Sequence, residues 1–271
     1  MLTLIWDSLL AFIALWSLGA SAVAKWDAFR PWPLLGVTIV AGLISASVWG
    51  RRLRRCAFSP REALVLLTLI CLGAGLLGQP AEHYPLVSES SIYPNTAVVL
   101  SRTGSFHTTF TPFEGLTEAQ KLLFYLPVSR QAGVTPRSYQ GMVNGVFYVM
   151  DAPTNTIVAS RQPVAPVWMG LAVLLFGPQA SMAVAPIFGI LGVVALYFWG
   201  KRVFNARVGA LAALLLLVSF PQLYFSRTPY SEIFGQVFMA GALYAWTSYL
   251  RLRERRYLAL GSLAYAAAFS A

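Results

Sequence analysis

Long apolar runs alternate with short polar segments along this chain. Each run is free of charge over most of its length and ends at charged residues, Gly or Pro, as membrane helices do. Most runs approach the ~20 residues that an α-helix needs to cross the hydrocarbon core of a bilayer. Seven helices are predicted, over about residues 4–23, 33–50, 63–79, 182–200, 208–223, 233–250 and 257–271. The pattern therefore predicts an all-α polytopic membrane protein.

The charge-free stretch that contains Val164–Phe176 is long enough for two spans. As a helix, however, Val164–Phe176 reaches only ~20 Å, short of the ~30 Å core. If it crossed, Lys201–Arg207 and Arg251–Arg256 would lie on the side opposite to Arg51–Arg61, against the positive-inside rule. We therefore expect an interfacial helix on the outer face, with Trp168 at the headgroup level.

On this topology the polar segment 80–161 is extracytoplasmic. We expect it to contain an amphipathic helix over Leu116–Leu126, capped by Thr117, and two short strands within Val146–Ile157. The interfacial helix should roof a cavity whose floor is the outer ends of three helices, 63–79, 182–200 and 233–250.

Composition agrees with a membrane protein, because 57% of the residues are hydrophobic and only 11% are charged. The net charge of +10 does not indicate nucleic-acid binding, since most basic residues lie in clusters beside apolar runs. Cys56 and Cys71 lack the spacing of a disulfide framework or a metal site, so both are expected to be free thiols. His83 and His107 are too few to indicate zinc. Met1–Ala24 has no basic n-region, which favours a retained helix over a cleaved signal.

Acidic side chains follow two of the apolar runs. Glu232 and Arg227 lie in a polar island between two long runs, and Glu82 and Glu89 follow another run. Charged groups are costly where a chain leaves the bilayer, so they are often retained for function. Two such segments on one face predict a shared site, with Glu89 and Glu232 at the rim of one outward-facing cavity.

Motif-bearing residues lie in three segments, Ser88–Ser105, Gln162–Gly177 and Ser226–Glu232. Together they resemble the GT-C membrane glycosyltransferases, in the branch that contains the protein O-mannosyltransferases and the lipid A aminoarabinose transferase. Ser88–Ser105 carries the Glu, Tyr, Ala and Gly of the first outer loop, Gln162–Gly177 resembles the His-Pro-Pro segment and its surface helix, and Ser226–Glu232 resembles the second acidic motif. The similarity covers roughly residues 75–271. Ser88 stands where the family usually has Asp, Val164 and Ala165 replace most of His-Pro-Pro, and two extra helices precede the usual first one.

The resemblance implies a GT-C-like transmembrane helix bundle with a mixed extracytoplasmic loop that carries interfacial helices. Residues 1–62 would form an N-terminal two-helix extension. Residues 63–271 would form the catalytic membrane core, including outer loop 80–181. Because the last run ends within an apolar helix, we expect this core to be truncated at its C-terminus.

The resemblance also implies transfer of a sugar from a polyprenyl-phosphate carrier to a lipid, glycan or protein acceptor at the outer face of the cell (inner) membrane. Glu89 would act as general base, and Glu232 would orient the donor sugar or the acceptor. Arg227 would pair with the carrier phosphate. The remaining candidate substrate-binding residues are Glu82, Tyr93, Arg102 and Arg161.

Simpler roles are open for the same residues. Glu232 also complements the dipole of the helix that follows it, and Arg102 and Arg161 also suit contact with lipid headgroups. Asp7, inside the first apolar run, suits a polar packing contact, or an interfacial position near the cytoplasmic edge, better than a proton relay. No cofactor is indicated, and a divalent metal stays open. The alternative functions are a transporter or flippase for a lipid-linked sugar and a non-catalytic membrane scaffold of the same fold.

Overall fold

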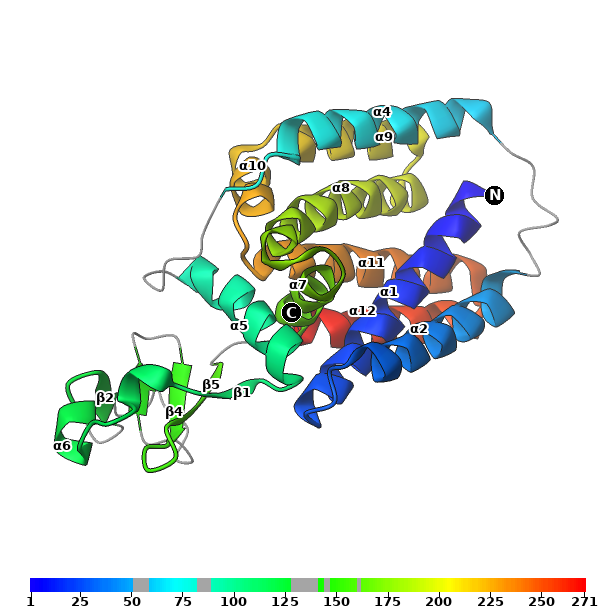
Figure 1. The fold of residues 1–271 in the computed structure, drawn as a ribbon. Helices are drawn as coiled ribbons and strands as arrows, with labels where there is room; N and C mark the ends of the chain where they lie inside the picture. The colour runs from blue at the N-terminus through cyan, green and yellow to red at the C-terminus, as the bar shows by residue number, and fades with distance from the viewer. Residues whose placement is uncertain (51–58, 82–88, 128–140, 144–146, 160–161) are drawn as a thin grey trace.

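The computed structural model describes residues 1–50, 59–81, 89–127, 141–143, 147–159 and 162–271. One part of the molecule is a bundle of helices, and the other is a small antiparallel sheet beyond one end of that bundle (Figure 1). The bundle is formed by α1 (Leu2–Lys25), α2 (Pro31–Ser45), α4 (Pro60–Leu77), α8 (Val184–Val203), α9 (Ala206–Leu217), α11 (Glu232–Leu252) and α12 (Arg255–Phe269).

Local signals fix where several of these helices begin. The Ser59 side chain accepts a hydrogen bond from the Glu62 backbone N–H, with Pro60 at the first helical position of α4. The Asn205 side chain caps α9 by accepting from two backbone N–H groups at 3.0 Å. The α8–α9 pair is close because Gly200 faces Gly209, where an added Cβ would lie 2.8 Å from the opposing Cα. These two helices therefore form a tight antiparallel pair.

Four helical segments of the described chain are long and apolar enough to cross a membrane, namely Leu2–Lys25, Pro31–Val48, Pro60–Leu77 and Pro178–Val203. The surfaces of α2 and α4 carry exposed large apolar side chains, among them Leu43 and Leu64. Exposure of these apolar side chains to water is unfavourable, whereas the hydrocarbon core of a bilayer would solvate them. The chain is an all-α membrane protein, as predicted. Helices α11 and α12 do not meet these criteria, so their predicted crossing stays a prediction.

The run predicted as one helix over 208–223 is broken. Helix α9 ends at Leu217, and α10 (Phe220–Arg227) leaves at an angle of 64° to it. The break has a local cause, because Ser219 takes an extended conformation and Pro221 occupies the first turn of the new helix, where its missing N–H costs nothing. The prediction of a continuous span was wrong on this point. The pair counts as a fifth candidate span only if the bent helices are taken together.

The segment between α4 and α8 contains α5 (Glu89–Thr103), α6 (Glu118–Lys121) and α7 (Val164–Phe176). Five strands pair in the order β1-β5-β4-β3-β2, all antiparallel where they adjoin. Their bounds are β1 His107–Thr109, β2 Tyr125–Pro127, β3 Gly141–Val143, β4 Phe147–Asp151 and β5 Thr156–Ala159. The two strands expected within Val146–Ile157 are therefore confirmed as β4 and β5, and they belong to a larger sheet.

Helix α6 is much shorter than the helix predicted over Leu116–Leu126. Thr117 caps it as expected, in a reciprocal capping box with Gln120. The helix ends after Lys121 because the chain must reach β2, which pairs with β3. Strand pairing thus overrides the helical pattern of the sequence.

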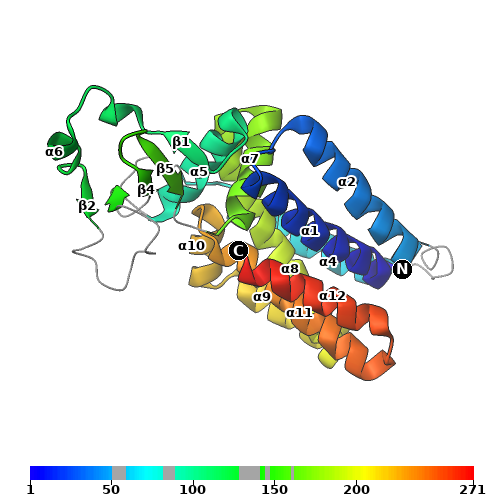
Figure 2. The same cartoon turned by 90° about the horizontal axis from the view of Figure 1, so that it is seen from below.

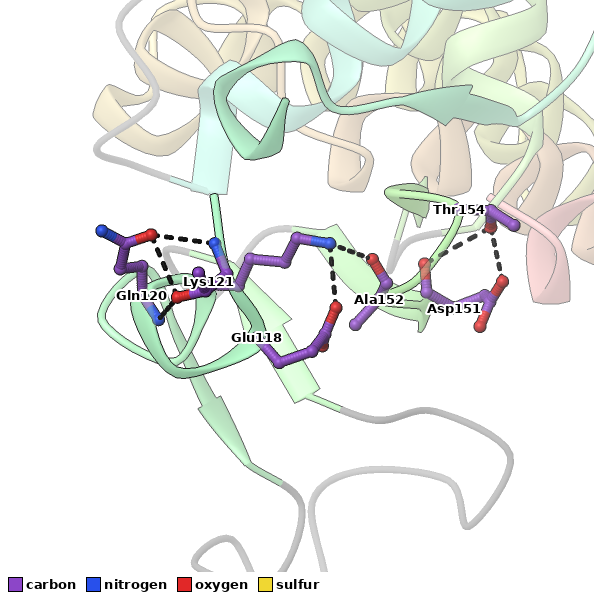
Figure 3. Close-up of polar contacts among 7 residues, drawn as sticks. Glu118, Gln120, Lys121, Asp151, Ala152 and Thr154 are labelled. Carbon is purple, nitrogen blue, oxygen red and sulfur yellow. Dashed lines mark hydrogen bonds and ion pairs between the residues drawn. The ribbon is translucent and has the colours of Figure 1, made fainter. Parts of the chain in front are cut away.

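Lys121 is buried and fixes α6 to the β4–β5 turn (Figure 3). Its Nζ donates to the carbonyl oxygen of Ala152 at 2.7 Å and lies 3.1 Å from Oε1 of Glu118. The turn itself is held by Thr154, whose hydroxyl donates to Oδ2 of Asp151 at 2.6 Å. A buried ammonium group is tolerated when it is paired and hydrogen-bonded, so this contact organises the small sheet.

Helix α1 is packed inside the bundle, against α2, α7 and α12 (Figure 2). Asp7 is fully buried and accepts hydrogen bonds from the hydroxyls of Tyr244 at 2.5 Å and Tyr257 at 2.9 Å. The predicted polar packing contact of Asp7 is thus present. It joins α1 to α11 and α12. The division of the chain into an extension 1–62 and a core 63–271 stays a prediction.

Candidate functional site

The two ends of the bundle differ in chemistry. One end, here called the basic end, carries Glu62, Lys201, Arg202 and the basic residues of Arg251–Arg256, and it is held by the Glu62–Lys201 ion pair. The opposite end, here called the loop end, carries the sheet, α5, α7, α10 and the start of α11 (Figures 1 and 2). The chain therefore gathers its described basic clusters at one end and the predicted site motifs at the other.

Glu232 is the first residue of α11 and is exposed at the loop end. It borders a pocket of about 160 Å³ between α9, α10 and α11. The lining residues are Leu216, Pro221, Gln222, Phe225, Glu232, Ile233 and Gln236. The carboxylate is thus placed at the mouth of a small cavity that is otherwise mostly apolar. At the N-terminus of α11 it also complements the helix dipole.

Two glutamine amides are fixed inside this pocket. Nε2 of Gln222 donates to the carbonyl oxygen of Gly189 at 3.1 Å, and Nε2 of Gln236 donates to Oε1 of Gln222 at 2.8 Å. The Ser226 hydroxyl lies 3.3 Å from Gln222 and packs against Gly189, where any Cβ would collide with it. Gln222 thereby uses both of its N–H groups, whereas the amide oxygen of Gln236 is left without a partner among the described residues and can accept from a sugar hydroxyl beside the carboxylate. Sequence reasoning missed both glutamines, although an amide inside an apolar run is a readable signal.

Arg227 ends a neighbouring helix. Its Nε and Nη2 donate to the carbonyl oxygen of Leu76 at 3.1 and 2.6 Å, near the C-terminus of α4. Its own carbonyl accepts from the Ala81 N–H at 2.7 Å. A cation at a helix C-terminus is favourable by itself. The predicted contact with a carrier phosphate would have to coexist with this cap.

Glu89 is the first residue of α5, but its side chain is outside the described part of the structure. Glu82 and Arg161 lie outside the described residues altogether. Tyr93, one turn further along α5, is buried in the same hydrophobic cluster as Ile233, the neighbour of Glu232. The start of α5 and the start of α11 thus share one core. Convergence of Glu89 and Glu232 stays a prediction, as does substrate contact by the buried Tyr93.

Arg102 lies apart from the start of α5. It is exposed in the last turn of that helix, thirteen positions after Glu89, which corresponds to ~20 Å along a helix. Arg30 donates to the carbonyl oxygens of Arg102 and Thr103 at 3.2 and 2.6 Å and so caps α5. Arg102 therefore belongs to the surface beside the α1–α2 turn, and its predicted contact with substrate stays a prediction.

Helix α7 roofs an apolar cavity of about 320 Å³, but its floor differs from the expectation. The lining comes from α1, α7 and the residues from Val184 to Leu191 of α8, with no contribution from α4 or α11. The sequence could not place α1 beneath α7, because that contact joins segments far apart in the chain. Trp168 was expected at the headgroups, but its indole N–H donates to the Ser17 hydroxyl at 2.8 Å and its ring lies 4.1 Å from that of Trp16.

Metal ligands do not gather in the described residues, where no group of three His, Cys, Asp or Glu side chains could hold an ion. His107 lies 3.7 Å from Asp27, which also accepts a hydrogen bond from Ser105. This pairing fixes the α1–α2 turn to β1. The described region of the loop end therefore offers carboxylate, amide and guanidinium groups.

The fold and the site define a polytopic membrane protein with a small pocket, bordered by a carboxylate and two amides, at one end of its helix bundle. Residues 160–270 match the family model of dolichyl-phosphate-mannose-protein mannosyltransferase. This segment covers α7 to α12, with Glu232 and both pocket glutamines. No curated protein and no solved structure matches the chain. The match covers less than half of the chain, and it supports the predicted resemblance to the GT-C superfamily of membrane glycosyltransferases.

Proposed function

We propose that this protein transfers a sugar from a polyprenyl-phosphate carrier to an acceptor hydroxyl at the outer face of the cell membrane. The observation that carries the proposal is the position of Glu232, within the matched segment, at the mouth of a pocket whose Gln222 and Gln236 amides are fixed. The Glu232 carboxylate and the amide oxygen of Gln236 supply hydrogen-bond acceptors for sugar hydroxyls.

In the proposed reaction the acceptor oxygen attacks the anomeric carbon of the donor sugar. Glu89 takes the acceptor proton, the bond from the anomeric carbon to the phosphate oxygen breaks, and polyprenyl phosphate leaves with the electron pair. Glu232 holds the sugar or the acceptor during this step. Arg227, Arg102 and Arg161 are the proposed cations for the phosphate, and Glu82 and Tyr93 complete the proposed substrate contacts.

A second cavity supports a lipid donor. It measures about 250 Å³, lies between α8, α9 and α11, and shares Leu216 and Gln236 with the Glu232 pocket. Its remaining lining is almost entirely apolar: Gly192, Leu196, Trp199, Met239, Ala240 and Leu243. An apolar groove that continues from a polar pocket suits a ligand with a polar head and an isoprenoid tail.

The test uses the full chain, purified in detergent and supplied with dolichyl-phosphate-mannose or other polyprenyl-phosphate sugars together with lipid, glycan and peptide acceptors. Release of polyprenyl phosphate coupled to sugar transfer is the expected result. Glu232→Gln should lower turnover by ~10²-fold or more if the carboxylate acts in the transition state.

Glu114→Gln is the control, because Glu114 is an exposed acid of the segment between α4 and α8 and lines neither cavity. Equal turnover in wild type and Glu232→Gln would show that Glu232 only complements the dipole of α11 and does not act in the reaction. Movement of a lipid-linked sugar across vesicles without release of polyprenyl phosphate would instead indicate the transporter.

A further inference from the structure

A second polar cavity lies at the basic end, far along the bundle from Glu232. It measures about 100 Å³ and is formed where α1, α8 and α11 meet. Its lining residues are Thr3, Phe198, Lys201, Arg202, Tyr244 and Arg251. Three cations from two helices thus converge on one small cavity.

The cations of this cavity are unequally neutralised. Lys201 pairs with Glu62 and lies 3.5 Å from the Thr3 hydroxyl. Among the residues that the structure describes, Arg202 and Arg251 have no carboxylate within ion-pairing distance. The next acid is Asp7, which contacts the cavity only through the Tyr244 hydroxyl. Arg202 and Arg251 thus carry positive charge at this cavity that no carboxylate among the described residues pairs with directly, which suits an anionic group such as a phosphodiester.

Both arginines are held in place before any ligand binds. The Arg202 guanidinium lies over the Tyr244 ring, 5.6 Å from its centroid, with Nη2 3.4 Å from the hydroxyl. Nη2 of Arg251 donates to the carbonyl oxygen of Val203 at 2.6 Å. Pre-positioned guanidinium groups recognise phosphate oxygens with directed hydrogen bonds.

Helix capping explains only part of this arrangement. Arg251 satisfies the end of α8 through the Val203 carbonyl, which is a sufficient structural role. Within the described part of the chain, Arg202 donates to no backbone carbonyl, and its guanidinium is instead held along the cavity wall by Tyr244. The guanidinium of Arg202 is therefore available to an anionic ligand on the side where α1, α8 and α11 meet.

We propose that this cavity binds a phosphate group, either the phosphodiester of an anionic phospholipid head or free phosphate. On the predicted topology the basic end faces the cytoplasmic leaflet, whose anionic lipids are attracted to juxtamembrane Lys and Arg. Occupancy would tie the first turn of α1 to α8 and α11. The proposal does not depend on glycosyl transfer at the loop end.

The test measures thermal stabilisation and lipid affinity of the full chain, delipidated in neutral detergent. The probes are dioleoylphosphatidylglycerol, dioleoylphosphatidylcholine and inorganic phosphate, each titrated separately. The variants are Arg202→Gln and Arg251→Gln. Arg207→Gln is the matched control, because Arg207 is an exposed cation of the same end that does not line the cavity.

General attraction to an anionic surface contributes about 1 kcal/mol per cation, or about fivefold in affinity. We expect each cavity variant to weaken phosphatidylglycerol binding tenfold or more and Arg207→Gln to weaken it fivefold or less. A conservative Arg251→Lys variant should recover part of the loss, which separates binding from misfolding.

The probes distinguish a phospholipid headgroup from free phosphate as the bound group. Stabilisation by phosphatidylglycerol alone supports a lipid headgroup, and stabilisation by inorganic phosphate that competes with the lipid supports free phosphate. Equal binding of phosphatidylcholine and phosphatidylglycerol, or equal losses in the cavity variants and Arg207→Gln, would overturn the proposal.

Discussion

At the scale of single residues, two arginines at the loop end cap helices in the same way. Arg227 donates to Leu76 near the end of α4, and Arg30 donates to Arg102 and Thr103 at the end of α5. Only Arg227 lies in the segment that resembles the second acidic motif. A comparison of variants at these two arginines therefore separates helix capping from any further role of Arg227 in carrier binding.

Arg227→Ala should lower the apparent Tm and also raise the KM for the polyprenyl-phosphate donor about tenfold or more, because it removes a charge-assisted contact to phosphate. Arg30→Ala should lower the apparent Tm alone, by about 2–4 °C for each kcal/mol lost. Donor titrations and thermal scans on both variants measure the two effects. If neither variant changes KM, Arg227 is a helix cap and nothing more.

Glu89→Gln should reduce turnover by ~10²-fold or more while leaving expression and carrier binding nearly unchanged, since the amide cannot accept the acceptor proton. Single-turnover kinetics with a saturating donor measure the chemical step. Glu114→Gln again serves as the control. An active Glu89→Gln variant would remove the general base from the proposed mechanism.

At the scale of elements, Asp7 joins three helices through two tyrosine hydroxyls. The carboxylate is fully buried on α1, and its partners Tyr244 and Tyr257 come from α11 and α12. Hydrogen bonds to a charged acceptor in a low-dielectric interior are strong, and a partner left unsatisfied there is costly. The contact thus links the first helix to the segment that matches the family model.

Asp7→Asn should destabilise the protein by about 2–3 kcal/mol, because the amide offers one acceptor where the carboxylate serves two hydroxyls. Tyr257→Phe should have a smaller effect, and the double variant should show a coupling of at least ~0.5 kcal/mol. Unfolding monitored by intrinsic fluorescence in detergent measures all three. Glu114→Gln, at an exposed acid between α4 and α8, is the control, and strict additivity of the two changes would contradict the proposed contact.

At the scale of the whole molecule, the polar groups are sorted between two ends of one bundle. The Glu62–Lys201 pair and the contact of Arg251 with Val203 join α4, α8 and α11 at the basic end. The polar pocket and the sheet lie at the other end. This sorting is what the positive-inside rule requires of a chain whose α7 does not cross the membrane.

Cysteine-accessibility labelling in a Cys-free background tests this sorting. Single cysteines at positions 120 and 228 should react with an impermeant reagent from outside the cell, and those at 54, 204 and 254 should react only after permeabilisation. The reason is that the predicted interfacial position of α7 would place the start of α8 on the outer side. Labelling of position 204 from outside would place α7 across the bilayer.

The sequence by itself determined the class of the molecule. Charge-free runs define membrane helices because a helix satisfies the backbone hydrogen-bonding groups where the bilayer core offers no water. Basic clusters beside these runs determine the orientation of the helices. Local rules also located the cap at Thr117 and the strands β4 and β5, since capping and alternation involve neighbours in the chain.

Only the tertiary structure decided how these elements meet. The burial of Asp7 against α11 and α12, the binding of Arg227 to Leu76, and the pairing of Gln222 with Gln236 join residues whose proximity no periodicity encodes. The shortening of α6 and the bend before α10 arise where strand pairing and a proline override the local apolar pattern. Long-range packing thus determined the pocket, whereas the bilayer as solvent had already determined the helices.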